Sequence, residues 1–122
     1  MKAPKTLALL ASAARTATTN SGDQSNEGYR GVHVVIDATA SAATPSVVFT
    51  IQGKDPVSGQ YYTILASTAV TGAETRVLRV FPGATGSNNL VANDQLPSVW
   101  RVLATAADAD SLTYSVSATL LP

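Results

Sequence analysis

A strict alternation of apolar and polar side chains near the end of the sequence constrains the fold more than any other feature. Leu112, Tyr114, Val116, Ala118 and Leu120 alternate there with serine and threonine. Because successive side chains of a β-strand point to opposite faces, this pattern predicts a strand with one buried face. No helical period of useful length competes with it elsewhere, so the sequence predicts an all-β chain.

Six further segments have strand character and are separated by turn residues. They comprise residues 5–19, 29–40, 46–53, 61–67, 74–81 and 98–106. Seven short strands in 122 residues predict an antiparallel β-sandwich of about seven strands, immunoglobulin-like or jelly-roll-like. Residues 54–60 combine aspartate, proline, serine and glycine and are predicted to form a hairpin connection. The predicted bulky core residues are Phe49, Tyr62, Trp100 and Tyr114.

The chain is predicted to divide into an N-terminal strand or arm at residues 1–20, a polar linker at 21–28 and a sandwich body at 29–122. A strand on a tether can pair with its own sheet or with the edge of a neighbouring subunit, and both pairings remain open. Lys2 and Lys5 precede a short apolar stretch, as they would in a secretory signal, but strand character continues beyond it. We therefore interpret the start as an arm.

Charge is scarce and balanced in this chain. Charged residues make up 13% of it, and eight basic residues offset eight acidic ones. The sequence thus lacks the basic excess with which proteins bind nucleic acid, and no apolar run is long enough to span a membrane. The absence of cysteine excludes disulfides, thiol catalysis and cysteine-ligated zinc. A surface so poor in charge predicts that much of it is covered in the working state.

Residues of catalytic or metal-binding type are few. His33 is the only histidine, which excludes multi-histidine metal sites, and its combination with Asp37 on one strand face lacks a nucleophile motif. A structural or interface role is predicted for it. Asp108 and Asp110 resemble the start of a calcium loop, but the glycine and glutamate that complete that motif are missing. A solvated turn is the preferred interpretation there.

Two pairs of side chains are candidates for contacts with partners. Tyr61 and Tyr62 would suit sugar stacking, but adjacent strand residues face opposite ways, so one core and one surface tyrosine are expected. Arg76 and Arg79 also lie on opposite faces, and one of them is placed to reach a partner carboxylate. We predict no catalytic residue, no cofactor and no metal site, and therefore no enzyme.

Several stretches together resemble small virion proteins of tailed bacteriophages. They are residues 10–16, 29–37, 49–59, 61–66, 100–102 and 107–116. The resemblance extends from Leu7 to Leu120 and contains no catalytic motif, so it supplies no site residue. It implies a non-enzymatic virion structural protein. The first choice is a capsid decoration (cement) protein that binds and stabilises the head surface, and the second is a neck, tail or fibre-associated protein.

The resemblance further implies the major capsid protein or other virion proteins as partners, a homo-oligomer, and assembly into the virion in the host bacterial cytoplasm. Neither nucleic acid nor a membrane is an expected partner. Two alternatives of other classes stay open. One is a β-sandwich module that binds a host-surface sugar through the Gly- and Asn-rich loop at 82–97. The other is a secreted adhesion domain, which requires the signal-peptide interpretation of the start.

Overall fold

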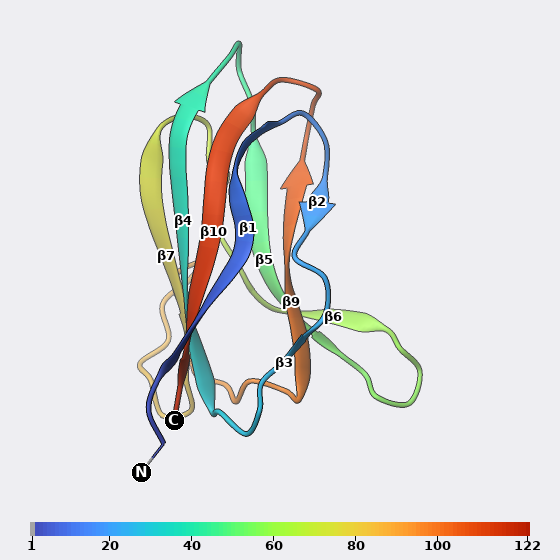
Figure 1. Cartoon of the computed structure of the whole chain (residues 1–122), viewed down its shortest axis with the longest axis vertical. Helices are drawn as coiled ribbons and strands as arrows, with labels where there is room; N and C mark the ends of the chain where they lie inside the picture. The colour runs from blue at the N-terminus through green and yellow to red at the C-terminus, as the bar shows by residue number, and fades with distance from the viewer. Residues whose placement is uncertain (1) are drawn as a thin grey trace.

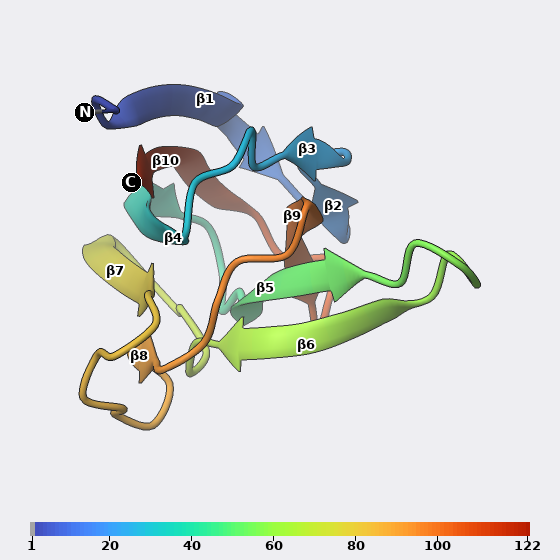
Figure 2. The ribbon, with the colours of Figure 1, turned by 90° about the horizontal axis from the view of Figure 1, so that it is seen from below.

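The computed structural model describes residues 2–122, whose ten β-strands form two sheets that pack face to face (Figures 1 and 2). The first sheet has the order β1 (Lys5–Arg15), β10 (Leu112–Leu121), β4 (Gly31–Ser41), β7 (Glu74–Val80) and β8 (Val91–Ala92). The second has the order β2 (Thr19–Asn20), β9 (Val99–Ala106), β5 (Val47–Lys54) and β6 (Tyr61–Ala66), and β3 (Gln24–Ser25) also pairs with β9. This arrangement confirms the predicted all-β sandwich.

The seven longer strands overlap the seven predicted segments, with β4, β5 and β10 each ending one residue later than predicted, and β2, β3 and β8 add two residues each. The pairings are antiparallel except that of β7 with β8, which is parallel. The turn between β5 and β6 has the predicted chemistry. Asp55 Oδ1 accepts a hydrogen bond from the Val57 N–H, and its Oδ2 accepts one from the Ser58 hydroxyl, each at 2.9 Å.

The N-terminal strand β1 pairs with β10 of the same chain, which is the intramolecular one of the two pairings left open. The Arg15 guanidinium lies 4.6 Å from the Tyr114 ring and donates to the Tyr114 carbonyl at 2.7 Å. The segment 21–28, predicted as a linker, runs along β9, where the backbone N–H of Ser21 donates to the Val102 carbonyl and its hydroxyl accepts from the Val102 N–H. Polar composition does not distinguish a linker from an edge segment that bonds to the next strand through such groups.

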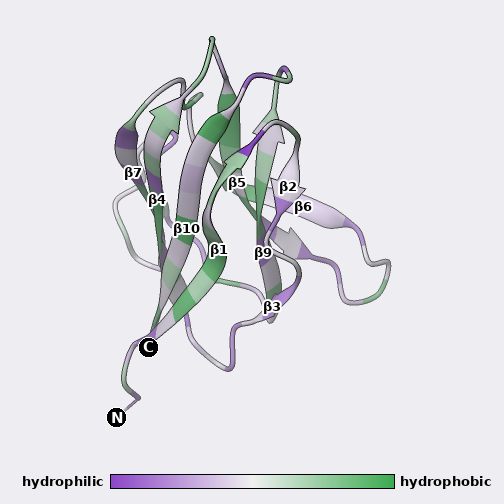
Figure 3. Ribbon diagram, turned by 45° about the horizontal axis from the view of Figure 1, so that its top comes forward, coloured by the Kyte–Doolittle hydropathy of each residue, from purple (hydrophilic) through white to green (hydrophobic). Residues whose placement is uncertain are grey.

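The core lies between the inner faces of the two sheets, where the alternation of side chains places the apolar residues. Along β10 this alternation is visible as apolar bands separated by paler ones (Figure 3). Three of the four predicted bulky core residues are buried as expected: Phe49, Trp100 and Tyr114. Phe49 of β5 and Tyr114 of β10 meet edge to face with their ring centroids 5.0 Å apart, so this pair joins the two sheets.

Tyr62, the fourth predicted core residue, is at the surface, with 46% of its area exposed. The register of β5 and β6 skips Ile64, which places Leu65 rather than Ile64 on the inner face, three residues from Tyr62. Beyond this irregularity the β5–β6 hairpin extends past the facing sheet (Figure 2), and the hydroxyl end of the Tyr62 ring lies over Gly53 of the neighbouring strand. The prediction was wrong because alternation within one strand does not reveal where the opposite sheet ends.

A buried hydroxyl at the end of β6 completes the pairing of β5. Ser67 is 3% exposed, its Oγ accepts from the Phe49 N–H at 3.0 Å, and it donates to the Thr68 carbonyl at 2.8 Å. Ser67→Ala leaves a buried N–H without this acceptor, and we expect it to lower the free energy of unfolding by about 1–2 kcal/mol. The matched control is Ser117→Ala on the exposed face of β10, for which urea denaturation should give a change within about 0.5 kcal/mol. Equal effects of the two substitutions would contradict the role of the Ser67 hydroxyl.

Candidate functional site

His33 lies on the outward face of β4, between Thr119 of β10 and Arg79 of β7 in the pairing register. Its Nε2 atom is buried without a hydrogen-bond partner. Burial lowers the pKa of His33 below its usual 6.5, and the positive charge of Arg79 lowers it further. Asp37 is four residues away on the same strand, a separation of about 13 Å, so the structure does not bring the two side chains together.

Asp108 and Asp110 are engaged in the turn between β9 and β10. Asp108 Oδ1 accepts from the Asp110 N–H at 3.0 Å, and Asp110 Oδ2 accepts from both the N–H and the hydroxyl of Thr44 at 3.2 Å. These bonds tie the β9–β10 turn to the loop between β4 and β5. Within residues 2–122, no three His, Asp or Glu side chains lie close enough together to hold a metal ion.

Arg76 and Arg79 are three positions apart in β7 and so lie on opposite faces of the sheet. Arg76 is engaged inside the chain, since its Nη2 lies 2.8 Å from Glu74 Oε1 and its Nη1 donates to the Thr68 hydroxyl at 2.7 Å. Arg79 is exposed beside His33. Neither arginine is part of a larger constellation, and the arginine that does belong to one is Arg101.

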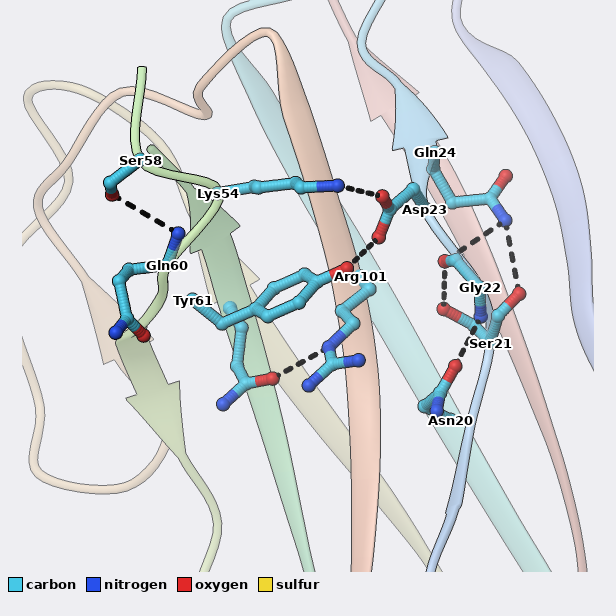
Figure 4. Close-up of polar contacts among 11 residues, drawn as sticks. Asn20, Ser21, Gly22, Asp23, Gln24, Lys54, Ser58, Gln60, Tyr61 and Arg101 are labelled. Atoms are coloured by element: carbon cyan, nitrogen blue, oxygen red, sulfur yellow. Dashed lines mark hydrogen bonds and ion pairs between the residues drawn. The ribbon is translucent and has the colours of Figure 1, made fainter. Parts of the chain in front are cut away.

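A cluster of charged and aromatic side chains covers part of the outer face of the second sheet (Figure 4). We call it the Arg101 cluster, and it consists of Asp23, Gln52, Lys54, Tyr61 and Arg101. Asp23 immediately precedes β3, Lys54 ends β5, Tyr61 begins β6 and Arg101 lies in β9. The Tyr61 hydroxyl donates to Asp23 Oδ1 at 2.6 Å, and Lys54 Nζ lies 2.8 Å from Asp23 Oδ2. The cluster therefore joins the base of the hairpin to the segment that runs along β9.

The Arg101 guanidinium is held by two neighbours. Its Cζ lies 3.5 Å from the centroid of the Tyr61 ring, and its Nε donates to Gln52 Oε1 at 2.8 Å. Gln52 and Arg101 are direct partners in the β5–β9 register, so the backbone pairing aligns the two side chains. Stacking on the ring fixes the plane of the guanidinium, and the hydrogen bond fixes its rotation within that plane.

The Asp23 carboxylate is kept in its charged form. The hydrogen bond from Lys54 lowers the pKa of Asp23 below its usual 3.8, the bond from Tyr61 lowers it further, and the same Asp23–Lys54 bond raises the pKa of Lys54. When folding lowers the pKa of a carboxyl group, the stabilisation by its ion pair is fully present at pH values above the usual aspartate pKa. It is lost as the pH falls through the lowered pKa, because the carboxylate becomes protonated. The pair is therefore intact at neutral pH, and because it is exposed to solvent it positions these groups more than it stabilises the fold.

The β5–β6 hairpin projects from the sandwich (Figure 2), and Lys54 and Tyr61 of the Arg101 cluster lie at its two strand ends. An open groove lies between this hairpin and β3, and its lining includes Asp23, Lys54, Val57 and Val99. Val57 at the tip of the hairpin is 94% exposed. An anchored cation, an ion pair and an exposed apolar side chain are groups that suit contact with another surface.

Arg101 was not singled out as a candidate from the sequence, although the alternation of residues 98–106 places it on the outward face. Its relation to Tyr61 depends on the order β9–β5–β6, which brings together residues that are 40 positions apart in the chain. A signal for it was nonetheless present. Arginine and aromatic side chains that share one face of a sheet are long enough to interact across its strands.

Within the described residues there is no helix whose length and apolar character would let it cross a membrane.

Comparison with other proteins does not assign a role to the Arg101 cluster. No family model matches the chain, and no curated protein sequence is significantly similar to it.

Proposed function

We propose that the protein is a non-enzymatic virion structural protein of a tailed bacteriophage, and that it acts as a capsid decoration (cement) protein on the head surface. The observation that carries this proposal is the projecting hairpin. It presents Val57 and part of Tyr62 to solvent, and apolar side chains on an element that projects from the sandwich suit contact with another protein. The resemblance of residues 7–120 to small virion proteins supports the same assignment.

The proposed mechanism is mechanical. Many copies bind to an assembled shell and bridge neighbouring capsomers, and their binding energy disfavours opening of the shell. Each contact is weak, but symmetric repetition makes the total large. Thr, Ser and Ala side chains form much of the exposed surface of the strands, and burying them avoids the cost of removing charges from water. The major capsid protein is the proposed partner, and the virion is the proposed location.

Copy number in purified particles tests the proposal. We expect quantitative mass spectrometry to give on the order of hundreds of copies per particle, because a decoration protein follows the symmetry of the shell. About a dozen copies would instead assign the protein to the neck or tail, where symmetric rings are small. Complete absence from particles would refute a virion role.

Substitutions at two exposed apolar residues test which surface makes the contact. Val57→Ser should lower the occupancy on particles without changing the melting temperature, because Val57 is 94% exposed and supports no core packing. Leu90→Ser is the matched control, since Leu90 is 43% exposed in the loop at 82–97. A loss of occupancy with Leu90→Ser alone would move the contact from the hairpin to that loop.

A further inference from the structure

The terminal nitrogens of Arg101 have no partner in the described part of the chain. Of its side-chain atoms, only Nε forms a hydrogen bond within residues 2–122, to Gln52, and Arg101 takes part in none of the three ion pairs found there. The buried side-chain atoms that lack a partner are His33 Nε2 and Trp100 Nε1, so Nη1 and Nη2 of Arg101 are reached by solvent. The guanidinium is thus fixed at one end and open at the other.

The one acidic group of the cluster, Asp23, forms no hydrogen bond or ion pair with the Arg101 guanidinium. Both carboxylate oxygens of Asp23 are engaged, Oδ1 by the Tyr61 hydroxyl and Oδ2 by Lys54. Lys54 and Arg101 supply two positive charges against the single negative charge of Asp23. The cluster therefore carries one spare positive charge, and its geometry places that charge on the open end of Arg101.

The other four arginines differ from Arg101. Arg15 donates to backbone carbonyls, Arg30 lies over the Phe81 ring and donates to the Pro122 carbonyl, and Arg76 pairs with Glu74. The Arg79 side chain forms no hydrogen bond, ion pair or ring contact with residues 2–122, although its backbone N–H donates to the Leu90 carbonyl, so no such contact orients its guanidinium. Arg101 alone combines a fixed plane, supported only by side chains, with a free pair of terminal N–H groups.

We propose that Arg101 binds a side-chain carboxylate of the protein on which this chain assembles, through a bidentate pair of hydrogen bonds from Nη1 and Nη2. The planar fork matches the two oxygens of a carboxylate, and the stacked ring has already removed much of the rotational freedom that such a pair costs. A carboxylate also balances the single spare charge. A phosphate dianion does not, because it brings two negative charges to a cluster with one spare positive charge. This inference rests on the proposed function only for the origin of the carboxylate.

An NMR titration of the purified protein tests the carboxylate site without any particle. The probe is sodium acetate, compared with sodium chloride at equal ionic strength, and the readout is the Nε–Hε resonance of each arginine. We expect acetate to shift the Arg101 resonance in a saturable way. The dissociation constant from this shift should be at least several-fold lower than that from the Arg79 resonance, which serves as the internal control. The Tyr61 ring signals give a second readout, which remains measurable when Arg101 is replaced. Arg101→Lys should abolish their saturable response to acetate, because lysine lacks the two terminal N–H groups of the guanidinium, and it should leave the melting temperature unchanged. Gln52→Ala should weaken the acetate response because it frees the guanidinium to rotate.

Three results would overturn the site: equal responses to acetate and chloride, equal responses of Arg101 and Arg79, or tighter binding of phosphate than of acetate. Particle binding then separates the site from the proposed function. We expect Arg101→Lys to weaken binding to particles about tenfold, as loss of a charge-assisted bidentate pair does, and Arg79→Lys to leave it unchanged. Full binding of Arg101→Lys to particles that bind the unsubstituted protein would refute the contact and leave the decoration role standing. A saturable acetate response in a protein that binds no particle would refute the decoration role instead.

Discussion

Trp100→Ala is expected to lower the free energy of unfolding by about 3–5 kcal/mol. The indole is fully buried on the inner face of β9, between the two sheets, and its removal leaves a cavity that the surrounding strands cannot fill. Because domains of this size are stable by only about 5–15 kcal/mol, much of the protein should be unfolded or close to unfolding. Urea denaturation followed by far-UV circular dichroism measures the loss.

Trp100→Phe is the matched control for this substitution. The Trp100 Nε1 atom is buried and donates to no acceptor, so replacing the indole with a phenyl ring sacrifices no hydrogen bond. We expect a clearly smaller loss than with alanine, because most of the apolar volume remains. The tryptophan emission of the unsubstituted protein should be blue-shifted and resistant to quenching by iodide. A red-shifted and readily quenched emission would contradict the position of Trp100.

Gly31→Ala is expected to destabilise the protein by about 3 kcal/mol, through overpacking rather than through a cavity. A β-carbon at Gly31 would overlap the backbone carbonyl of Val80 and the ring of Phe81, where β4 begins beside the end of β7. A backbone carbonyl in a paired strand cannot move aside as a flexible side chain can. The change should appear as a shift of the urea midpoint at constant m-value.

Gly72→Ala provides the comparison for Gly31. A β-carbon at Gly72 has no atom within 4 Å, so we expect the free energy of unfolding to change by no more than about 0.5 kcal/mol. Alanine also lowers the conformational entropy of the unfolded chain, which favours the folded variant. If both substitutions are tolerated equally, the close approach of β4 and β7 at Gly31 is incorrect.

The longer strands could be predicted from the sequence because each of them buries one face. In β4 and β10 the inward positions are apolar without interruption, so a period of two is unmistakable. The two-residue strands β2, β3 and β8 could not be predicted, since two residues have no period. Tyr62 shows the other limit, because its exposure depends on a register irregularity and on the extent of the facing sheet.

The candidate site was less predictable than the fold for a related reason. The alternation of residues 98–106 indicates that Arg101 faces outward, but its contact with Tyr61 requires knowledge that β5 lies between β9 and the return strand. The pairing of Asp23 with Lys54 likewise requires the segment 21–28 to lie on β9, whereas its polar composition favoured a linker. Local pattern determines which face a residue occupies, and only the order of strands determines which residues share that face.

The position of β10 between β1 and β4 has a consequence for the order in which this chain acquires its structure. β10 is the last strand in the sequence, and it is the only neighbour of β1 and one of the two neighbours of β4 in the first sheet. During synthesis, β1 therefore has no intramolecular strand partner until residues 112–121 have left the ribosome. Its backbone stays unpaired until then, and its apolar side chains have no sheet to pack on. Pairings between such distant segments form slowly. A nascent chain that is arrested before β10 emerges should expose β1 to chaperones and to aggregation. Once β10 is released, it should pair with β1 along one edge and with β4 along the other, which completes the first sheet.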